Sequence, residues 1–244
     1  TRAIALDPND ANAHTWRGVA YFVKGQNDRA IKDYDKAIDL DPNDAVAYTN
    51  RGIAYAKKGQ YDRAIENFNK AIAINPNDAS AYNNRGNAYI DKGQYDRAIE
   101  DFNKVIALDP NAANAYTNRG RAYGKKGQYD RAIEDYDKAI ALNPNFAWAY
   151  FAYFYRGNAY AKKGHYDRAI EDYNKAIPKN PPNGTEVYFA RGGTYYYKGQ
   201  YDKAIEDFNM VIALDPNDAE AYSNRGLAYY RTGQYDRAIE DFNK

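Results

Sequence analysis

Residues that could carry out chemistry are few, because the chain has only two histidines and no cysteine. Without cysteine it can form no disulfide, no thiolate nucleophile and no cysteine-based zinc site. His14 and His165 lie far apart, and neither has a second histidine at the spacing of a metal site. We interpret His14 as a core side chain and His165 as a surface variant. The sequence therefore predicts no metal site and no cofactor.

Acidic side chains are plentiful, but their positions repeat along the chain together with nearby arginines. Five Arg/Asp pairs stand at i, i+4 in the same local sequence: Arg29/Asp33, Arg97/Asp101, Arg131/Asp135, Arg168/Asp172 and Arg237/Asp241. Such pairs stabilise an exposed helix by about 0.2–0.5 kcal/mol each. A charge pattern that recurs in this way is typical of a solvated face. Phosphate-binding glycine loops, nucleophile elbows and His-Glu-x-x-His are absent, so we predict that the protein is not an enzyme.

Charge balance and the lengths of the apolar runs argue against two further classes of function. The 244 residues include 34 Lys+Arg and 33 Asp+Glu, and this balance gives no reason to expect nucleic-acid binding. No apolar run approaches the roughly 20 residues that span a bilayer, so we expect no membrane insertion. The sequence does not fix the compartment, although the cytoplasm is favoured.

An internal repeat organises the whole chain. The dipeptide Arg-Gly begins at Arg17, Arg51, Arg85, Arg119, Arg156, Arg191 and Arg225. The steps between these arginines are 34, 34, 34, 37, 35 and 34 residues. A fixed period of this length is typical of stacked structural repeats.

Each repeat has the pattern of two amphipathic helices, as residues 45–78 show. Apolar and small side chains fall on one helical face at Ala45, Tyr48, Gly52 and Tyr55. Lys57-Lys58-Gly59 then supplies cations and a glycine cap. A second helical face follows at Tyr61, Ala64, Ile65, Phe68, Ala71 and Ile72. Asn75-Pro76 ends this second helix.

These patterns predict an all-α chain of stacked helix pairs. A helix of about 14 residues is marginal alone in water, so each pair needs its neighbours to bury both apolar faces. We expect residues 1–10 to be the end of a preceding repeat. Seven repeats should follow, at 11–44, 45–78, 79–112, 113–146, 147–183, 184–218 and 219–244, the last one truncated.

The repeat resembles the tetratricopeptide repeat (TPR). The residues that carry the resemblance are Tyr48, Gly52, Tyr55, Ala64, Phe68, Ala71 and Pro76, and the match recurs in all seven units. The resemblance implies a right-handed superhelical α-solenoid in which the first helix of each pair lines a concave groove. It also implies a scaffold whose partner is a protein or a peptide.

One departure from the family pattern is systematic, because arginine replaces the usual leucine before the glycine in every unit. In one interpretation the arginine stem packs like leucine and its head reaches a polar partner. Asp41, Asp109 and Asp215 in the turns between units are candidate partners. In the other interpretation the arginines form a ladder that binds an anion.

Asparagines on the first helices are candidate peptide-binding residues. The residue before the arginine is asparagine in four units, at Asn50, Asn84, Asn118 and Asn224. An amide offers a donor and an acceptor to a peptide backbone, and asparagines at this place do so in peptide-binding members of the family. The further candidates are Thr49, Asn83, Asn87, Thr117, Arg121, Lys57 and Lys125. The alternative is that these asparagines are exposed polar filler. The chaperone-binding clamp of one subfamily is not expected, because its first-helix lysine is missing.

The fifth unit is the most irregular and suggests self-association. Three extra residues lie in the aromatic run Phe146–Tyr155, and Pro178 should shorten the second helix. The run either extends a packed helix or forms an exposed surface, with Trp148, Tyr150, Phe151 and Phe154 as candidate contacts for a second copy. Neither end carries a distinct capping helix, so a homo-oligomer joined through the ends is also possible.

Overall fold

The computed structural model describes residues 2–144, 149–177 and 184–244, and within them every regular element is an α-helix. The chain divides into two compact units, Thr1–Ala122 and Tyr123–Lys244. The first unit contains α1 (Arg2–Leu6), α2 (Ala11–Val23), α3 (Asn27–Leu40), α4 (Ala45–Lys57), α5 (Tyr61–Ile74), α6 (Ala79–Asp91), α7 (Tyr95–Leu108) and most of α8 (Ala113–Lys125). The second contains α9 (Tyr129–Leu142), α10 (Ala149–Lys162), α11 (Tyr166–Ala176), α12 (Gly184–Tyr197), α13 (Tyr201–Leu214), α14 (Ala219–Arg231) and α15 (Tyr235–Phe242).

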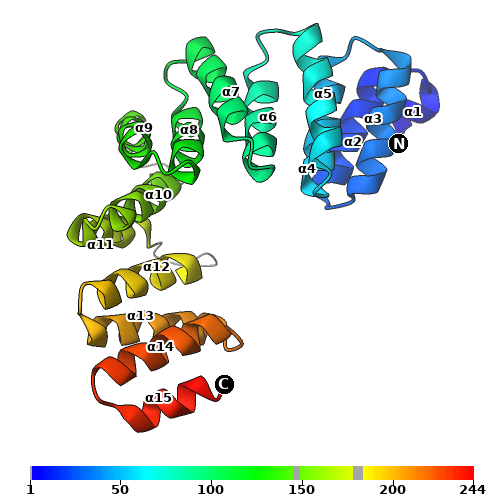
Figure 1. The fold of residues 1–244 in the computed structure, drawn as a ribbon. Coiled ribbons are helices and arrows are strands. Elements are labelled where there is room, and N and C mark those ends of the chain that lie inside the picture. Colours follow the sequence, from blue (N-terminus) through cyan, green and yellow to red (C-terminus); the bar gives the residue numbers. More distant parts are fainter. Residues whose placement is uncertain (1, 145–148, 178–183) are drawn as a thin grey trace. The chain divides into compact units, whose positions relative to one another are not determined.

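Within each unit the helices form consecutive pairs, which Figure 1 shows as a series of hairpins. In the first unit α2 packs on α3, α4 on α5 and α6 on α7, and α3 also packs on α4 and α5 on α6. The second unit repeats this arrangement, with α10 on α11, α12 on α13 and α14 on α15. The predicted all-α class and the stacked helix pairs are therefore confirmed.

Local sequence explains where the first helices begin and end. Asp44 precedes α4, and its carboxylate accepts hydrogen bonds from the N–H groups of Val46 and Ala47, which otherwise lack partners at a helix start. At the other end Gly59 adopts φ 71°, a left-handed conformation that glycine takes without a steric penalty. The chain then turns directly into α5.

Close approach between paired helices depends on the glycine that follows each arginine. A Cβ atom on Gly52 would lie 2.6 Å from Cε1 of Phe68, which is fully buried. The same contact recurs between Gly86 and Phe102 and between Gly18 and Tyr34. Each aromatic ring of a second helix thus lies directly against the backbone of the first.

The fifth repeat departs from the others partly as predicted. Helix α11 has 11 residues, whereas α9 and α13 have 14 each, so the expected shortening is confirmed. Pro178 itself, Trp148 and the predicted boundaries at residues 146/147 and 183 lie outside the described residues. The other predicted repeat boundaries stay predictions.

Candidate functional site

The repeated arginines tie three helices together. Arg85 on α6 donates from Nε to Oδ2 of Asp101 (2.9 Å) and from Nη2 to Oδ1 of the same carboxylate (2.6 Å). Its Nη1 donates to Oδ1 of Asn69 on the preceding second helix (2.6 Å). The same three-helix contact recurs at Arg191 with Asp207 and Asn174, and at Arg225 with Asp241 and Asn209.

Aromatic rings and burial complete this arginine site. The guanidinium of Arg85 lies 5.4 Å from the ring centroid of Tyr82, and Asp101 is 4% exposed. Hydrogen bonding to Asp101 raises the pKa of Arg85, while burial raises the pKa of the Asp101 carboxyl because its charged form has left water. The interpretation that the arginine head reaches a polar partner is confirmed, and each guanidinium nitrogen of Arg85 already donates to a side chain of this chain.

The partners predicted for these arginines are wrong. Asp41, Asp109 and Asp215 instead accept hydrogen bonds from backbone N–H groups two residues further along their own turns. The reason is their short side chains, which favour such local bonds in turns.

The predicted i, i+4 pairs on the second helices are also wrong for Arg29 and Arg97. Arg29 donates to Oε1 of Gln26 and lies over the ring of Tyr21, and Asp33 turns inward to Arg17. Arg97 likewise donates to Gln94. The carboxylates sit on the buried side of the second helix, so they face the first helix rather than solvent. The recurring spacing of 16 residues between arginine and aspartate was the signal in the sequence.

Both threonines proposed for binding turn out to be internal. Thr49 is 6% exposed, and its hydroxyl donates to Oδ2 of Asp78 (3.1 Å), the capping residue of α6. Thr117 is 9% exposed and donates to the carbonyl of Ala113 (3.0 Å). We therefore withdraw the two threonines as peptide-binding residues, because both are buried and their hydroxyls already donate to groups of this chain.

The asparagines before the arginines are half-buried and differ in how their amides are used. Asn50 forms no hydrogen bond within the part of the chain that the structure describes. The amide nitrogen of Asn84 donates to the carbonyl of Ser80 (2.9 Å), and that of Asn224 donates to the carbonyl of Glu220 (2.8 Å). The amide oxygens of Asn84 and Asn224 accept no hydrogen bond within the part of the chain that the structure describes.

Four of the predicted residues come together between α6 and α8. The amide nitrogen of Asn118 donates to Oδ1 of Asn83 (3.1 Å), and Nη1 of Arg121 donates to Oδ1 of Asn118 (3.3 Å). Nη1 of Arg121 also lies 3.5 Å from Oδ1 of Asn87. We use the name first-helix face for the side of α4, α6 and α8 that carries Asn50, Asn84, Asn118 and Arg121. Lys57 and Lys125 are exposed at the last turns of α4 and α8.

Aromatic residues predicted for self-association are largely packed into the second unit. Phe154 is buried, and its ring centroid lies 6.2 Å from that of Tyr173. Tyr150 and Phe151 are half-buried and stack edge to face at 4.9 Å. Phe154 is therefore removed as a contact residue, and the described part of the run fits the packed-helix interpretation.

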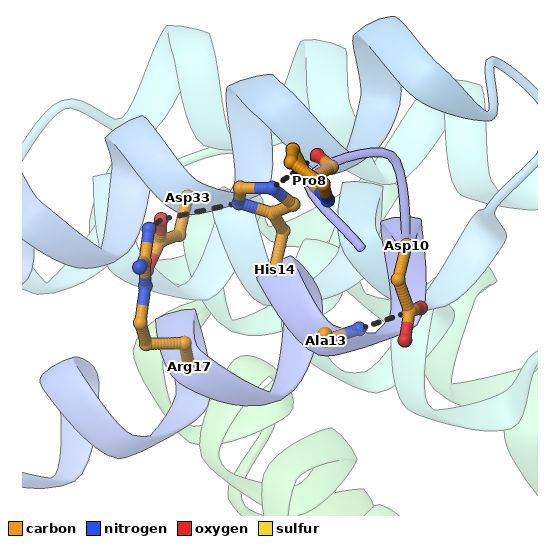
Figure 2. A network of polar contacts seen from close by, with 6 residues as sticks. All are labelled: Pro8, Asp10, Ala13, His14, Arg17 and Asp33. Carbon is orange, nitrogen blue, oxygen red and sulfur yellow. Dashed lines mark hydrogen bonds and ion pairs between the residues drawn. The ribbon is translucent and has the colours of Figure 1, made fainter. Parts of the chain in front are cut away.

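The two histidines have the roles that the sequence indicates. In Figure 2, His14 lies between the turn at Pro8 and the Arg17–Asp33 pair. Its Nε2 is 3.1 Å from the carbonyl of Pro8, and its Nδ1 is 3.6 Å from Oδ1 of Asp33. His165 is exposed at the start of α11. The described residues contain no group of three or more metal-binding side chains.

Membrane crossing finds no support among the helices that the structure describes, because none is both long and apolar enough.

Comparison with solved structures places the fold among known repeat proteins. MamA is 30% identical over 75% of this chain and 97% of its own, with a TM-score of 0.58. YrrB, described as a TPR protein with an unusual peptide-binding site, is 26% identical over 77% of this chain and 95% of its own, with a TM-score of 0.57. A chain of the APC/C hetero-tetramer Cut9–Hcn1 shares the fold at 22% identity and a TM-score of 0.80 over 92% of this chain. The present chain spans 44% of that relative's length.

Family descriptions match along nearly the whole sequence. The description "TPR repeat" matches residues 20–59, 86–127 and 192–233. "Tetratricopeptide repeat" matches 45–78, 113–146 and 150–183 and, in a second form, 1–32 and 67–100. No curated protein matches the sequence. The helix pairs, the glycine–aromatic contacts and these matches together show that the chain belongs to the tetratricopeptide repeat family.

Proposed function

We propose that this protein is an interaction scaffold that binds an extended peptide segment of another protein on its first-helix face. Proteins of the TPR family generally mediate protein–protein interactions, and their repeats are typically non-catalytic. The observation that carries the proposal is Asn50, a half-buried amide whose donor and acceptor are both unused in the described residues.

Geometry along the face supports an extended ligand. The first helices α4 and α6 are direct neighbours, and Asn50 and Asn84 occupy the same position of successive repeats. Amides in such a row can pair with the N–H and C=O groups of a strand-like backbone without reading its side chains. The Asn83–Asn118–Arg121 network holds the next part of the face in a fixed arrangement.

Similarity to YrrB supports the same proposal, since that protein is described as having a peptide-binding site. The likeness is one of fold, and the first-helix residues of this chain, which differ from one repeat to the next, would determine which peptide it binds.

Selection of peptides on the purified chain tests the proposal. Peptides enriched from a random 12-residue library would be measured by calorimetry against wild type and an Asn50→Ala/Asn84→Ala variant. Each lost backbone hydrogen bond should cost about 0.5–1.5 kcal/mol, so we expect about 5- to 100-fold weaker binding. An Asn43→Ala variant, altered in an exposed turn, is the matched control. Equal affinity of the double variant and the wild type would contradict binding at this face.

Self-association is a second candidate function, favoured by exposed apolar residues on α2 and α15. Ile239 and Phe242 on α15 are 58% and 51% exposed, whereas Phe102, the counterpart of Phe242, is fully buried. Trp16 and Val23 on α2 are exposed as well. A patch of this kind on two faces can join copies end to end.

A further inference from the structure

A ladder of ion pairs runs along the turns that connect the two helices of each repeat. The lysine just before the turn glycine pairs with an aspartate in the first turn of the preceding repeat's second helix. The pairs are Lys58 with Asp28, Lys92 with Asp62, Lys163 with Asp130, and Lys198 with Asp167. Every such aspartate is about four-fifths exposed.

The aspartate, the turn beside it and the paired lysine together line a shallow hollow. One hollow of about 460 Å³ is lined by Gly25, Gln26, Asp28 and Arg29 together with Lys58. The next, of about 440 Å³, is lined by Gly59, Gln60, Tyr61 and Asp62 together with Lys92. The paired lysine therefore forms one wall of the hollow beside each of these two turns.

The ladder breaks between the sixth and seventh repeats, where Thr232 stands in place of the lysine. The Thr232 hydroxyl turns back to its own helix and donates to the carbonyls of Ala228 and Tyr229. Asp202, the aspartate that a lysine would have paired with, is exposed and makes no ion pair or hydrogen bond with the residues that the structure describes. Gly199, Gln200 and Tyr201 before it match Gly59, Gln60 and Tyr61, which line the hollow beside Lys92.

We propose that the turn at Gln200, Tyr201 and Asp202 binds the primary ammonium of a lysine side chain from a protein partner. The occupied turns show the same residue types binding this group inside the chain. Charge complementarity selects the ligand, because an unpaired carboxylate favours a cation, and Tyr201 directly precedes Asp202 in the sequence. Tyr201 is part of a wider aromatic cluster, since its ring centroid lies 5.3 Å from that of Tyr196.

Nearby cations of the chain do not satisfy Asp202. Arg231 donates from Nε to the hydroxyl of Tyr196 (3.2 Å), and this hydrogen bond raises the pKa of Arg231. Lys198 pairs with Asp167, and Lys203 lies over the ring of Tyr195. Arg231 would directly precede a lysine placed at position 232. Such a neighbour is compatible with pairing, because Lys57 precedes Lys58 and Lys162 precedes Lys163.

A single exposed ion pair contributes little affinity, so the turn is a secondary contact that selects lysine-bearing partners. The inference is independent of the first-helix face. Asp202 and Tyr201 lie at the start of α13, on a second helix, and peptide binding through Asn50 can fail or succeed without affecting this turn.

Nuclear magnetic resonance tests the inference on the full chain. The probe is the peptide acetyl-Gly-Lys-Gly-amide, with its Nε-acetyllysine form as the uncharged comparison. We expect the amide signals of residues 200–202 to shift with the lysine peptide and not with the acetylated one. Asp202→Asn should weaken the response about 2- to 5-fold, the range of an exposed ion pair. Thr232→Lys should weaken it similarly, because the chain's own lysine would then pair with Asp202.

Asp167→Asn is the matched control, because Lys198 already occupies that turn, and residues 200–202 should respond as in wild type. Circular dichroism would verify that Thr232→Lys folds, which the four existing pairs lead us to expect. An unchanged response in Thr232→Lys, or equal shifts with both peptides, would overturn the proposal. Shifts of residues 200–202 that depend on protein concentration without peptide would assign the site to a second copy instead.

Discussion

At the residue scale, the arginine in place of leucine changes what holds a repeat together. Leucine would bury a hydrocarbon chain, whereas Arg85 brings a charge that needs Asp101 and Asn69 as hydrogen-bond acceptors. Buried ion pairs of this kind add little net stability over an apolar replacement, because desolvation offsets the attraction. They are nevertheless costly to break, since the remaining charge has no partner.

Arg85→Leu should therefore destabilise the protein although leucine is usual in the family. Asp101 would keep a buried carboxylate without its guanidinium, at a cost of about 3–5 kcal/mol at pH 7. The variant Arg85→Leu/Asp101→Leu should recover most of this loss. Urea unfolding followed by circular dichroism would measure both midpoints. If the double variant were no more stable than the single one, the ion pair itself would not be the cause.

Lowering the pH should reduce the destabilisation caused by Arg85→Leu, and the direction of this effect follows from the pKa of Asp101. Burial already raises that pKa with Arg85 present, and removing the cation raises it further. A carboxyl whose folded-state pKa lies above the unfolded value of about 3.9 lowers the stability when the pH is above the folded-state pKa. This loss disappears when the pH falls below the unfolded value, because the group is then protonated in both states. The difference in unfolding midpoint between Arg85→Leu and wild type should thus narrow as the pH falls toward 4.

At the element scale, two helical glycines with opposite surroundings allow a matched test of the packing. Gly52→Ala in α4 would place a methyl group 2.6 Å from Cε1 of the buried Phe68, and such overpacking costs about 1–3 kcal/mol. Gly193→Ala in α12 meets nothing within 4 Å and should stabilise its helix by about 0.5–1 kcal/mol. Thermal unfolding would show shifts of opposite sign. Two shifts of the same sign would mean that helix propensity, rather than the aromatic contact, determines the effect.

Helices could be predicted from the sequence because each signal occurs many times. The apolar spacing, the turn glycine and the Asn/Asp-Pro stop recur in phase, so the helix prediction made for one repeat applies to all the others. Contacts between helices were harder to predict. Asp101 has the same i, i+4 relation to Arg97 as a surface pair, and only the three-dimensional packing shows that it faces Arg85. Thr49 looked like a binding residue for the same reason, since a helical pattern does not show which polar side chain is covered by the next repeat.

At the scale of the whole molecule, stability is a sum of repeats and of the interfaces between neighbours. Such an interface buries the apolar faces of neighbouring repeats. An apolar face that is exposed instead can associate with another molecule. Ile239 and Phe242 on α15 form such a face, and so do Trp16 and Val23 on α2. These two faces are different surfaces, so contact between them is heterologous and does not close on itself.

Size in solution should therefore depend on concentration if the exposed faces of α2 and α15 associate. Light scattering coupled to size exclusion, from micromolar to millimolar protein, should show growth beyond 27.7 kDa in steps of one chain. Ile239→Lys/Phe242→Lys should shift the growth to higher concentration, because two charges would have to lose water in the contact. Val46→Lys is the matched control, since Val46 is an equally exposed apolar residue of α4 away from both ends. A strictly monomeric wild type would remove self-association and leave peptide binding on the first-helix face as the function to pursue. Growth that persists in the α15 variant would instead direct attention to Tyr150 and Phe151 on α10.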